Sequence, residues 1–169
     1  IAGDGYFVVG SDGGNDNFFT RAGNFYLDKE GDLVTGDGLY VLKKDGGKIR
    51  IPIEAKDISI GTDGTVNFLI DGQIEDAGKI ALAKFSNTSG LQKVGNNLFK
   101  ESTNSGDARI LDSGESGLGT IQSNMLEMSN VDLSEEFTEM IVAQRGFQAN
   151  TRIITTSDEI LQELVNLKR

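Results

Sequence analysis

Two different spacings of apolar residues divide the chain into two parts. In the first part, short runs of β-branched and aromatic residues alternate with polar turn residues, a pattern typical of short antiparallel strands. We expect strands at residues 6–9, 24–27, 39–42, 49–51, 58–60, 66–70 and 80–83, with two further short strands near Leu98 and Ile110. The polar, Gly- and Ser-rich stretch over residues 87–119 is otherwise expected to form loops.

Asp-Gly pairs separate many of the expected strands. They occupy positions 4/5, 12/13, 37/38, 45/46, 63/64 and 71/72. Asp tolerates a left-handed backbone and Gly adopts one at little cost, so these pairs predict tight hairpin turns. The one proline, Pro52, predicts an edge strand or a bulge, because proline cannot donate a hydrogen bond to a sheet.

After residue 131 the apolar spacing changes to alternating steps of three and four, which predicts a helix that runs to the C-terminus. Asp132 or Ser134 is expected to cap it, and Glu135 and Glu136 suit the positive end of the helix dipole. At 1.5 Å per residue, such a helix is about 50 Å long. The expected fold is therefore mainly β, with an antiparallel β-rich domain at residues 1–125 and a long C-terminal α-helix at residues 126–169.

The expected helix has an apolar stripe and no second helix in the chain to cover it. Heptad steps along the stripe reach the polar residues Gln144 and Thr151, and Gly146 costs about 1 kcal/mol relative to Ala in a helix interior. The stripe could pack on the sheet, but we favour a helix outside this chain together with other molecules. The predicted self-assembly interface comprises Leu133, Phe137, Met140, Ile141, Gln144, Gly146, Phe147, Thr151, Ile154, Leu161 and Val165.

Composition argues against several classes of function. The chain has no Cys and no His, which removes thiol nucleophiles, His-based triads and the usual zinc ligands. The formal net charge of −10 opposes binding to nucleic acid and to anionic lipid. No apolar run approaches the roughly 20 residues that cross a bilayer. We therefore expect no enzyme, no cofactor or metal site, no nucleic-acid partner and no membrane insertion.

Four local patterns suggest chemistry, and each has a simpler structural interpretation. Residues 72–79 resemble a phosphate-binding loop but have the wrong glycine spacing, which favours a hairpin turn. Residues 12–17 offer oxygen ligands for Ca²⁺, yet they lack the downstream glutamate of a calcium loop. Asp112 and Glu115 could pair as glycosidase carboxylates, although such pairs arise by chance in an acidic protein. The remaining pattern is a possible sugar-binding platform of aromatic residues, for which core packing is the favoured alternative; its residues are Phe18, Phe19, Phe25 and Tyr26.

Two separated motifs resemble those of the bacterial flagellar axial proteins, the hook and rod family. Near the C-terminus, residues 129–133 read SNVDL, residues 140–150 read MIVAQRGFQAN and residues 155–161 read TTSDEIL. Near the N-terminus, residues 3–9 read GDGYFVV and residues 20–28 read TRAGNFYLD. The resemblance covers residues 1–42 and 125–169, and Phe147 stands where the family commonly has Tyr.

The resemblance implies a β-rich outer domain and paired terminal helices in the coiled-coil-like wall of a tube. We expect a fragment without the family's N-terminal helix, because the chain begins at Ile1. The implied function is a structural subunit that polymerises helically into the flagellar hook, the flexible joint that passes torque from motor to filament. The distal rod is the alternative, and a secreted carbohydrate-binding β-domain is a more remote one. Expected partners are further copies of the chain and neighbouring rod, hook-cap and hook–filament junction proteins, after type III export to the flagellar basal body and hook, outside the cell.

Overall fold

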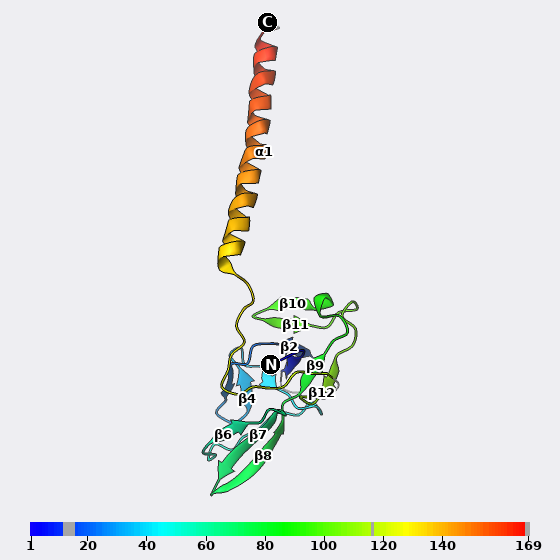
Figure 1. Ribbon diagram of the computed structural model, residues 1–169, viewed down its shortest axis with the longest axis vertical. Helices are drawn as coiled ribbons and strands as arrows, with labels where there is room; N and C mark the ends of the chain where they lie inside the picture. Colours follow the sequence, from blue (N-terminus) through cyan, green and yellow to red (C-terminus); the bar gives the residue numbers. More distant parts are fainter. Residues whose placement is uncertain (12–15, 116, 168–169) are drawn as a thin grey trace. The chain divides into compact units, whose positions relative to one another are not determined.

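The computed structural model describes residues 1–11, 16–115 and 117–167, which form two compact units. The first unit, Ile1–Glu127, contains all the described strands, and the second begins at Met128 and contains one long helix (Figure 1). The predicted fold class, mainly antiparallel β with a long C-terminal helix, is confirmed.

A large antiparallel sheet forms most of the first unit. Among the described residues it contains nine strands: β1 (Tyr6–Gly10), β2 (Asn17–Thr20), β3 (Phe25–Leu27), β4 (Leu33–Thr35), β5 (Tyr40–Val41), β9 (Leu82–Lys84), β10 (Gln92–Gly95), β11 (Leu98–Lys100) and β12 (Arg109–Leu111). Their order is β10-β11-β2-β1-β5-β4-β3, and β9 joins β1 to β12. A 3₁₀ turn, η1 (Thr88–Gly90), precedes β10. Strand β1 is the hub of this sheet, because β2, β5 and β9 all pair with it.

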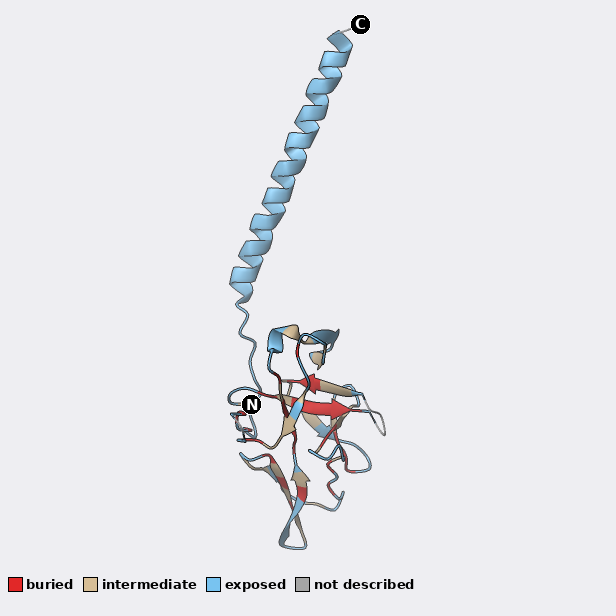
Figure 2. Cartoon of the chain, turned by 90° about the vertical axis from the view of Figure 1, so that its right-hand side faces the viewer, coloured by how far each residue is buried: buried red, intermediate tan, exposed pale blue. Residues whose placement is uncertain are grey.

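Strand β1 is buried on both of its faces. Phe7 and Val9 point into one apolar cluster, whereas Val8 points into another that contains Phe19 and Phe85. Successive side chains on a strand alternate between faces, so an uninterrupted apolar run needs cover on both sides. The run at residues 6–9 therefore marks the centre of the unit. Figure 2 shows that the described buried residues all lie within the first unit and that the helix is exposed along its length.

A second antiparallel sheet covers one face of the first. Its described strands are β6 (Ile58–Ile60), β7 (Thr65–Ile70) and β8 (Gln73–Lys79), in that order. Val66 and Phe68 of β7 alternate inward and join the same cluster as Phe7 and Val9. The two sheets thus share one core, which makes the first unit a single packed body.

The strand predictions differ from the structure in two respects. Residues 49–51 form only an isolated bridge, Asp32↔Arg50, although Ile49 and Ile51 are fully buried. Pro52 follows this segment outside any strand, so the predicted edge strand or bulge there is wrong. The sequence pattern does not predict β2, β4, β8 and β10, because these strands are either short or contain polar and glycine residues that interrupt an apolar alternation.

Four of the Asp-Gly pairs form hairpin turns, as predicted, but the pair at 4/5 lies between the Ala2 bridge and β1 and forms no hairpin. Gly38, Gly46, Gly64 and Gly72 have φ between 78° and 82°, the left-handed region that glycine adopts at least cost. The pair at 12/13 lies outside the described residues. Residues 72–79 form the β7–β8 hairpin and strand β8, which confirms the hairpin interpretation over a phosphate-binding loop.

Helix α1 (Leu133–Leu167) accounts for the second unit. The Oδ1 atom of Asp132 accepts a hydrogen bond from the Ser134 amide at 2.8 Å, so Asp132 is the N-terminal cap. Glu135 and Glu136 lie in the first turn, as predicted. Within the described residues, no helix is long and apolar enough to cross a membrane.

Candidate assembly surface

Helix α1 presents an apolar stripe with no cover of its own. All eleven predicted interface residues lie on α1, and all are exposed, as is every other described residue of the helix. Large apolar side chains such as Phe137 and Phe147 are exposed by 56% and 76%. Contiguous exposed apolar surface of this kind marks an interaction site.

Helix geometry groups most of the predicted residues on one face. At about 100° per residue, a single arc of about 120° contains nine of them. These are Leu133, Phe137, Met140, Gln144, Phe147, Thr151, Ile154, Leu161 and Val165. Ile141 lies just outside this arc, whereas Gly146 lies about 120° from its centre and belongs to a different face.

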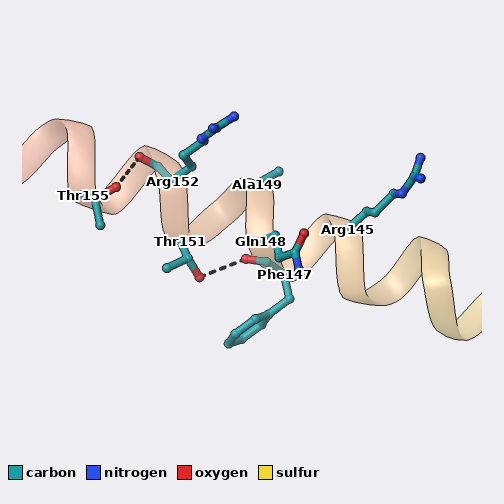
Figure 3. A pocket seen from close by; sticks show the side chains of 7 residues that line it. All are labelled: Arg145, Phe147, Gln148, Ala149, Thr151, Arg152 and Thr155. Carbon is teal, nitrogen blue, oxygen red and sulfur yellow. Dashed lines mark hydrogen bonds between the residues drawn. The ribbon is translucent and has the colours of Figure 1, made fainter.

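The stripe is less polar than its residue types indicate. The Thr151 hydroxyl donates to the carbonyl of Phe147 at 3.0 Å, and the Thr155 hydroxyl donates to the carbonyl of Arg152 at 2.9 Å (Figure 3). Such bonds satisfy the hydroxyl within its own helix and leave the methyl group for packing. By residue type Thr151 interrupts the apolar stripe, and only its rotamer shows that it is compatible with an apolar contact.

Side chains on α1 enclose two shallow hollows. Seven residues line one hollow, which Figure 3 shows: Arg145, Phe147, Gln148, Ala149, Thr151, Arg152 and Thr155. The other lies nearer the C-terminus, among Asp158, Leu161, Gln162, Val165 and Asn166. In packed helices, grooves between side chains three and four residues apart receive the side chains of a neighbouring helix. The residues that line these hollows are therefore candidates for contact with a neighbouring helix.

Charge on α1 is arranged in blocks. Within its described residues and cap, the arginines are Arg145 and Arg152, and Figure 3 shows both extending from the same side of the helix, away from the ring of Phe147. The acidic residues lie on either side of this basic segment along the sequence: Asp132, Glu135, Glu136 and Glu139 before it, and Asp158, Glu159 and Glu163 after it.

In the first unit, the side chain of Arg21 connects residues near the start of the unit with Glu127 at its end. Its guanidinium donates to the carboxylate of Glu127 through Nε and Nη2, with the shortest distance 2.8 Å. It also donates to the carbonyls of Gly3 at 2.8 Å and Gly5 at 2.7 Å. We call this group of residues the Arg21 clasp. It ties down the last residues of the unit, and no local sequence pattern indicated it.

The candidate glycosidase carboxylates form a surface ion cluster. Asp112 and Glu115 both lie 3.7 Å from the ammonium of Lys44, which is itself about half exposed. Two carboxylates that share one lysine are a common surface arrangement, and each such pair contributes less than about 1 kcal/mol. The geometry therefore explains both residues without a reaction.

The other candidate sites also have structural explanations. Asp16, from the possible calcium loop, pairs with Lys100 at 2.9 Å, and residues 12–15 lie outside the described residues. Phe19 is buried, Phe18 and Phe25 pack against the core, and only Tyr26 is exposed, so core packing describes these aromatic residues better than a sugar platform. Across residues 1–11, 16–115 and 117–167, no three acidic residues gather into a possible metal site.

Two family models match this chain, one at each end. Residues 1–68 match the flagellar hook protein FlgE/F/G D1 domain, and residues 122–167 match the flagellar basal body rod FlgEFG protein C-terminal model. The second match contains all of α1, including the eleven predicted interface residues.

Individual relatives include both rod and hook proteins. The flagellar basal-body rod protein FlgG of Bacillus subtilis is 58% identical over the whole chain, and that of Caulobacter vibrioides is 40% identical over 99% of it. The flagellar hook protein FlgE of Borreliella burgdorferi is 58% identical over 61% of the chain, which is 23% of its own length. The chain spans 64% and 63% of the two rod proteins, just under two thirds of each.

Proposed function

The chain belongs to the flagellar hook and rod protein family, and we propose that it is a structural subunit of the basal-body rod. The observation that carries the proposal is the extent of the similarity. Rod proteins match from end to end, whereas the Borreliella burgdorferi hook protein matches 61% of the chain. The family resemblance of the sequence motifs implied the hook, with the distal rod as the alternative, whereas the match of rod proteins over the whole of this chain favours the rod.

In this proposal, α1 supplies the assembly surface. Its apolar stripe has no partner within its own unit, and each large side chain contributes about 1–2 kcal/mol when a neighbour removes it from water. Association itself costs about 4–15 kcal/mol in lost freedom, so several such side chains must be buried together. The length of α1, 35 residues, provides that many on one face.

The two units have different roles in the proposed polymer. The α1 helices of many copies, together with helices outside this chain, form the wall of a tube. The first units, which we call the β units (Ile1–Glu127), form its outer layer. The core shared by the two sheets makes each β unit stiff. Bending and torsion are therefore taken up at contacts between subunits, where polar surfaces slide at little cost.

The family membership places the protein in the bacterial flagellum. We infer that it reaches its position by type III export and that it contacts neighbouring rod proteins. Hook-cap and hook–filament junction proteins are partners only if this protein also forms part of the hook. A role as an enzyme or as a carbohydrate-binding domain receives no support from the surface around Asp112 or from the buried aromatic residues.

The hook remains a second candidate, because the hook proteins of Borreliella burgdorferi and Treponema pallidum match about three fifths of the chain at 58% and 48% identity. A strain that lacks this protein separates the two functions. Loss of a rod subunit leaves basal bodies with an incomplete rod, whereas loss of a hook subunit leaves a complete rod that ends without a hook. Electron microscopy of isolated basal bodies makes the distinction, and an intact rod with an intact hook would refute both proposals.

A further inference from the structure

Two columns of charged residues run along different faces of α1. Asp132 and Glu139, one heptad apart, form one column, which we call the acidic column, and Gly146 extends it by one heptad as an uncharged position. Arg145 and Arg152, one heptad apart, form the basic column. Positions one heptad apart on an α-helix are separated by only about 20° around the axis, so each column faces one direction.

The two columns lie on opposite flanks of the apolar stripe. The number of residues from Asp132 to Arg145 is the same as the number from Glu139 to Arg152, and we call this shared separation the column offset. It corresponds to a rotation of about 140° between the columns. The residues of both columns are exposed. One helix therefore offers an acidic face to one neighbour and a basic face to another.

We propose that the basic column of one copy binds the acidic column of the next, with the two helices parallel and displaced by the column offset, about 20 Å along the axis. The partner is a second copy of this chain, so the inference rests on the proposed function and names the contact that it requires. In this register Arg145 meets Asp132 of the next copy, and Arg152 meets Glu139 of the next copy.

Other parallel registers align the same columns less well. A displacement one heptad shorter pairs Arg145 with Glu139 but places Arg152 opposite Gly146. A displacement one heptad longer pairs only Arg152, with Asp132. Of these three registers, only the column offset satisfies both arginines. Surface ion pairs contribute less than about 1 kcal/mol each, so in this contact the charges select the register. The centre of the apolar stripe lies about 90° from the acidic column and about 130° from the basic column, so the stripe is left for a different neighbour.

Because the two columns are different surfaces, the contact is heterologous. A heterologous contact leaves an unused acidic face at one end and an unused basic face at the other, and repetition then builds an open filament. Gly146 belongs to the acidic column, and in the chain itself a Cβ at this position has open space around it. In the proposed register Gly146 faces Glu159 of the neighbour, which lets the two backbones approach closely beside the ion pairs.

Cross-linking of single-cysteine variants tests the register, because the chain contains no cysteine. Ala143→Cys lies beside the acidic column, and Thr156→Cys lies one column offset further along the sequence, beside the basic column. The two variants, mixed in equal amounts and treated with a short bis-maleimide, should yield mainly the mixed dimer. If the chains met at random, the mixed dimer would be only as abundant as the two dimers of identical variants taken together. That result, or the absence of any dimer, would overturn the register.

A charge exchange tests the ion pairs themselves. Arg152→Glu in the Thr156→Cys chain should lower the yield of mixed dimer about fivefold, and Glu139→Lys in the Ala143→Cys chain should restore it. Lys93→Glu makes the same change of charge on the β unit and should leave the yield unchanged. Failure of Glu139→Lys to rescue Arg152→Glu would overturn the pairing of these two residues.

These results separate the register from the proposed function. Wild-type filaments seen by negative-stain microscopy, combined with a random cross-linking pattern, would retain the rod proposal and refute the register. A dominant mixed dimer from chains that never form filaments would support the register and count against the rod proposal.

Discussion

Arg21 offers the sharpest test of how the β unit is closed. In Arg21→Met the side chain keeps most of its apolar stem, but the Glu127 carboxylate and the carbonyls of Gly3 and Gly5 lose their shared donor. Arg21 and Glu127 are 28% and 38% exposed, so solvent weakens the ion pair, which contributes about 0.5–1 kcal/mol. The two carbonyls add about 1–2 kcal/mol, because hydrogen bonds to a charged donor are the stronger kind.

We therefore expect Arg21→Met to lower the free energy of unfolding by about 2–3 kcal/mol and Glu127→Gln to lower it by about 1 kcal/mol or less. Urea unfolding followed by tyrosine fluorescence is suitable, since the guanidinium lies 6.0 Å from the Tyr6 ring. Arg109→Met, which removes an exposed arginine from β12, should change the stability by less than about 0.5 kcal/mol.

The order of the two losses is the critical result. If Glu127→Gln costs as much as Arg21→Met, the carbonyl contacts contribute nothing and the reasoning fails. Hydrogen exchange adds a local measurement: in Arg21→Met, residues 122–127 should lose protection while β1 retains it. That loss would lengthen the untethered connection before α1, which begins at Leu133.

Three further predictions concern separate parts of the chain. Gly31→Ala should destabilise the β unit far more than Gly38→Ala in the same unfolding assay. Both glycines have positive φ, but a Cβ at Gly31 would overlap the Ile51 carbonyl, whereas a Cβ at Gly38 would meet open space. Equal losses of stability in the two variants would refute this. Hydrogen bonds from the Thr65 hydroxyl and amide lower the pKa of Asp63 from 3.8 to about 2. Its carboxylate therefore stabilises the fold above pH 3.8, and the stability advantage over Asp63→Asn should disappear as the pH falls towards 2; an advantage that persists at pH 2 would contradict this. Gly146→Ala should stabilise the helix by about 1 kcal/mol, seen as higher helicity in circular dichroism. It should also weaken self-association measured by sedimentation, and stronger association would argue against close approach of two helices at this position.

Local periodicity predicted most of the elements correctly. The helix beginning near residue 132, its cap at Asp132 and the hairpin turns at the Asp-Gly pairs depend on interactions within a few residues. The sequence pattern predicted the structure less well where a segment is held by residues distant in the sequence. Strand β8 begins with Gln73–Asp76, where Ile74 is the one apolar residue, and is held by pairing with β7. Residues 49–51 contribute two core side chains without a regular strand.

The assembly surface divides in the same way. The sequence alone places nine interface candidates on one helical face and the charged columns on others, because side-chain direction in a helix repeats with a known angle. Only the structure shows that the Thr151 hydroxyl is satisfied within the helix and that Asp112 and Glu115 share Lys44.

By itself, the sequence determined the two periodicities, the turns, the helix with its exposed stripe and the family resemblance. The tertiary structure decided which strands pair with β1, which sheet covers the core and which carboxylate Arg21 binds, 106 residues away along the chain. The physical reason is range. A backbone repeat is set by neighbouring residues, whereas a long-range contact exists only after the whole chain has brought its partners together.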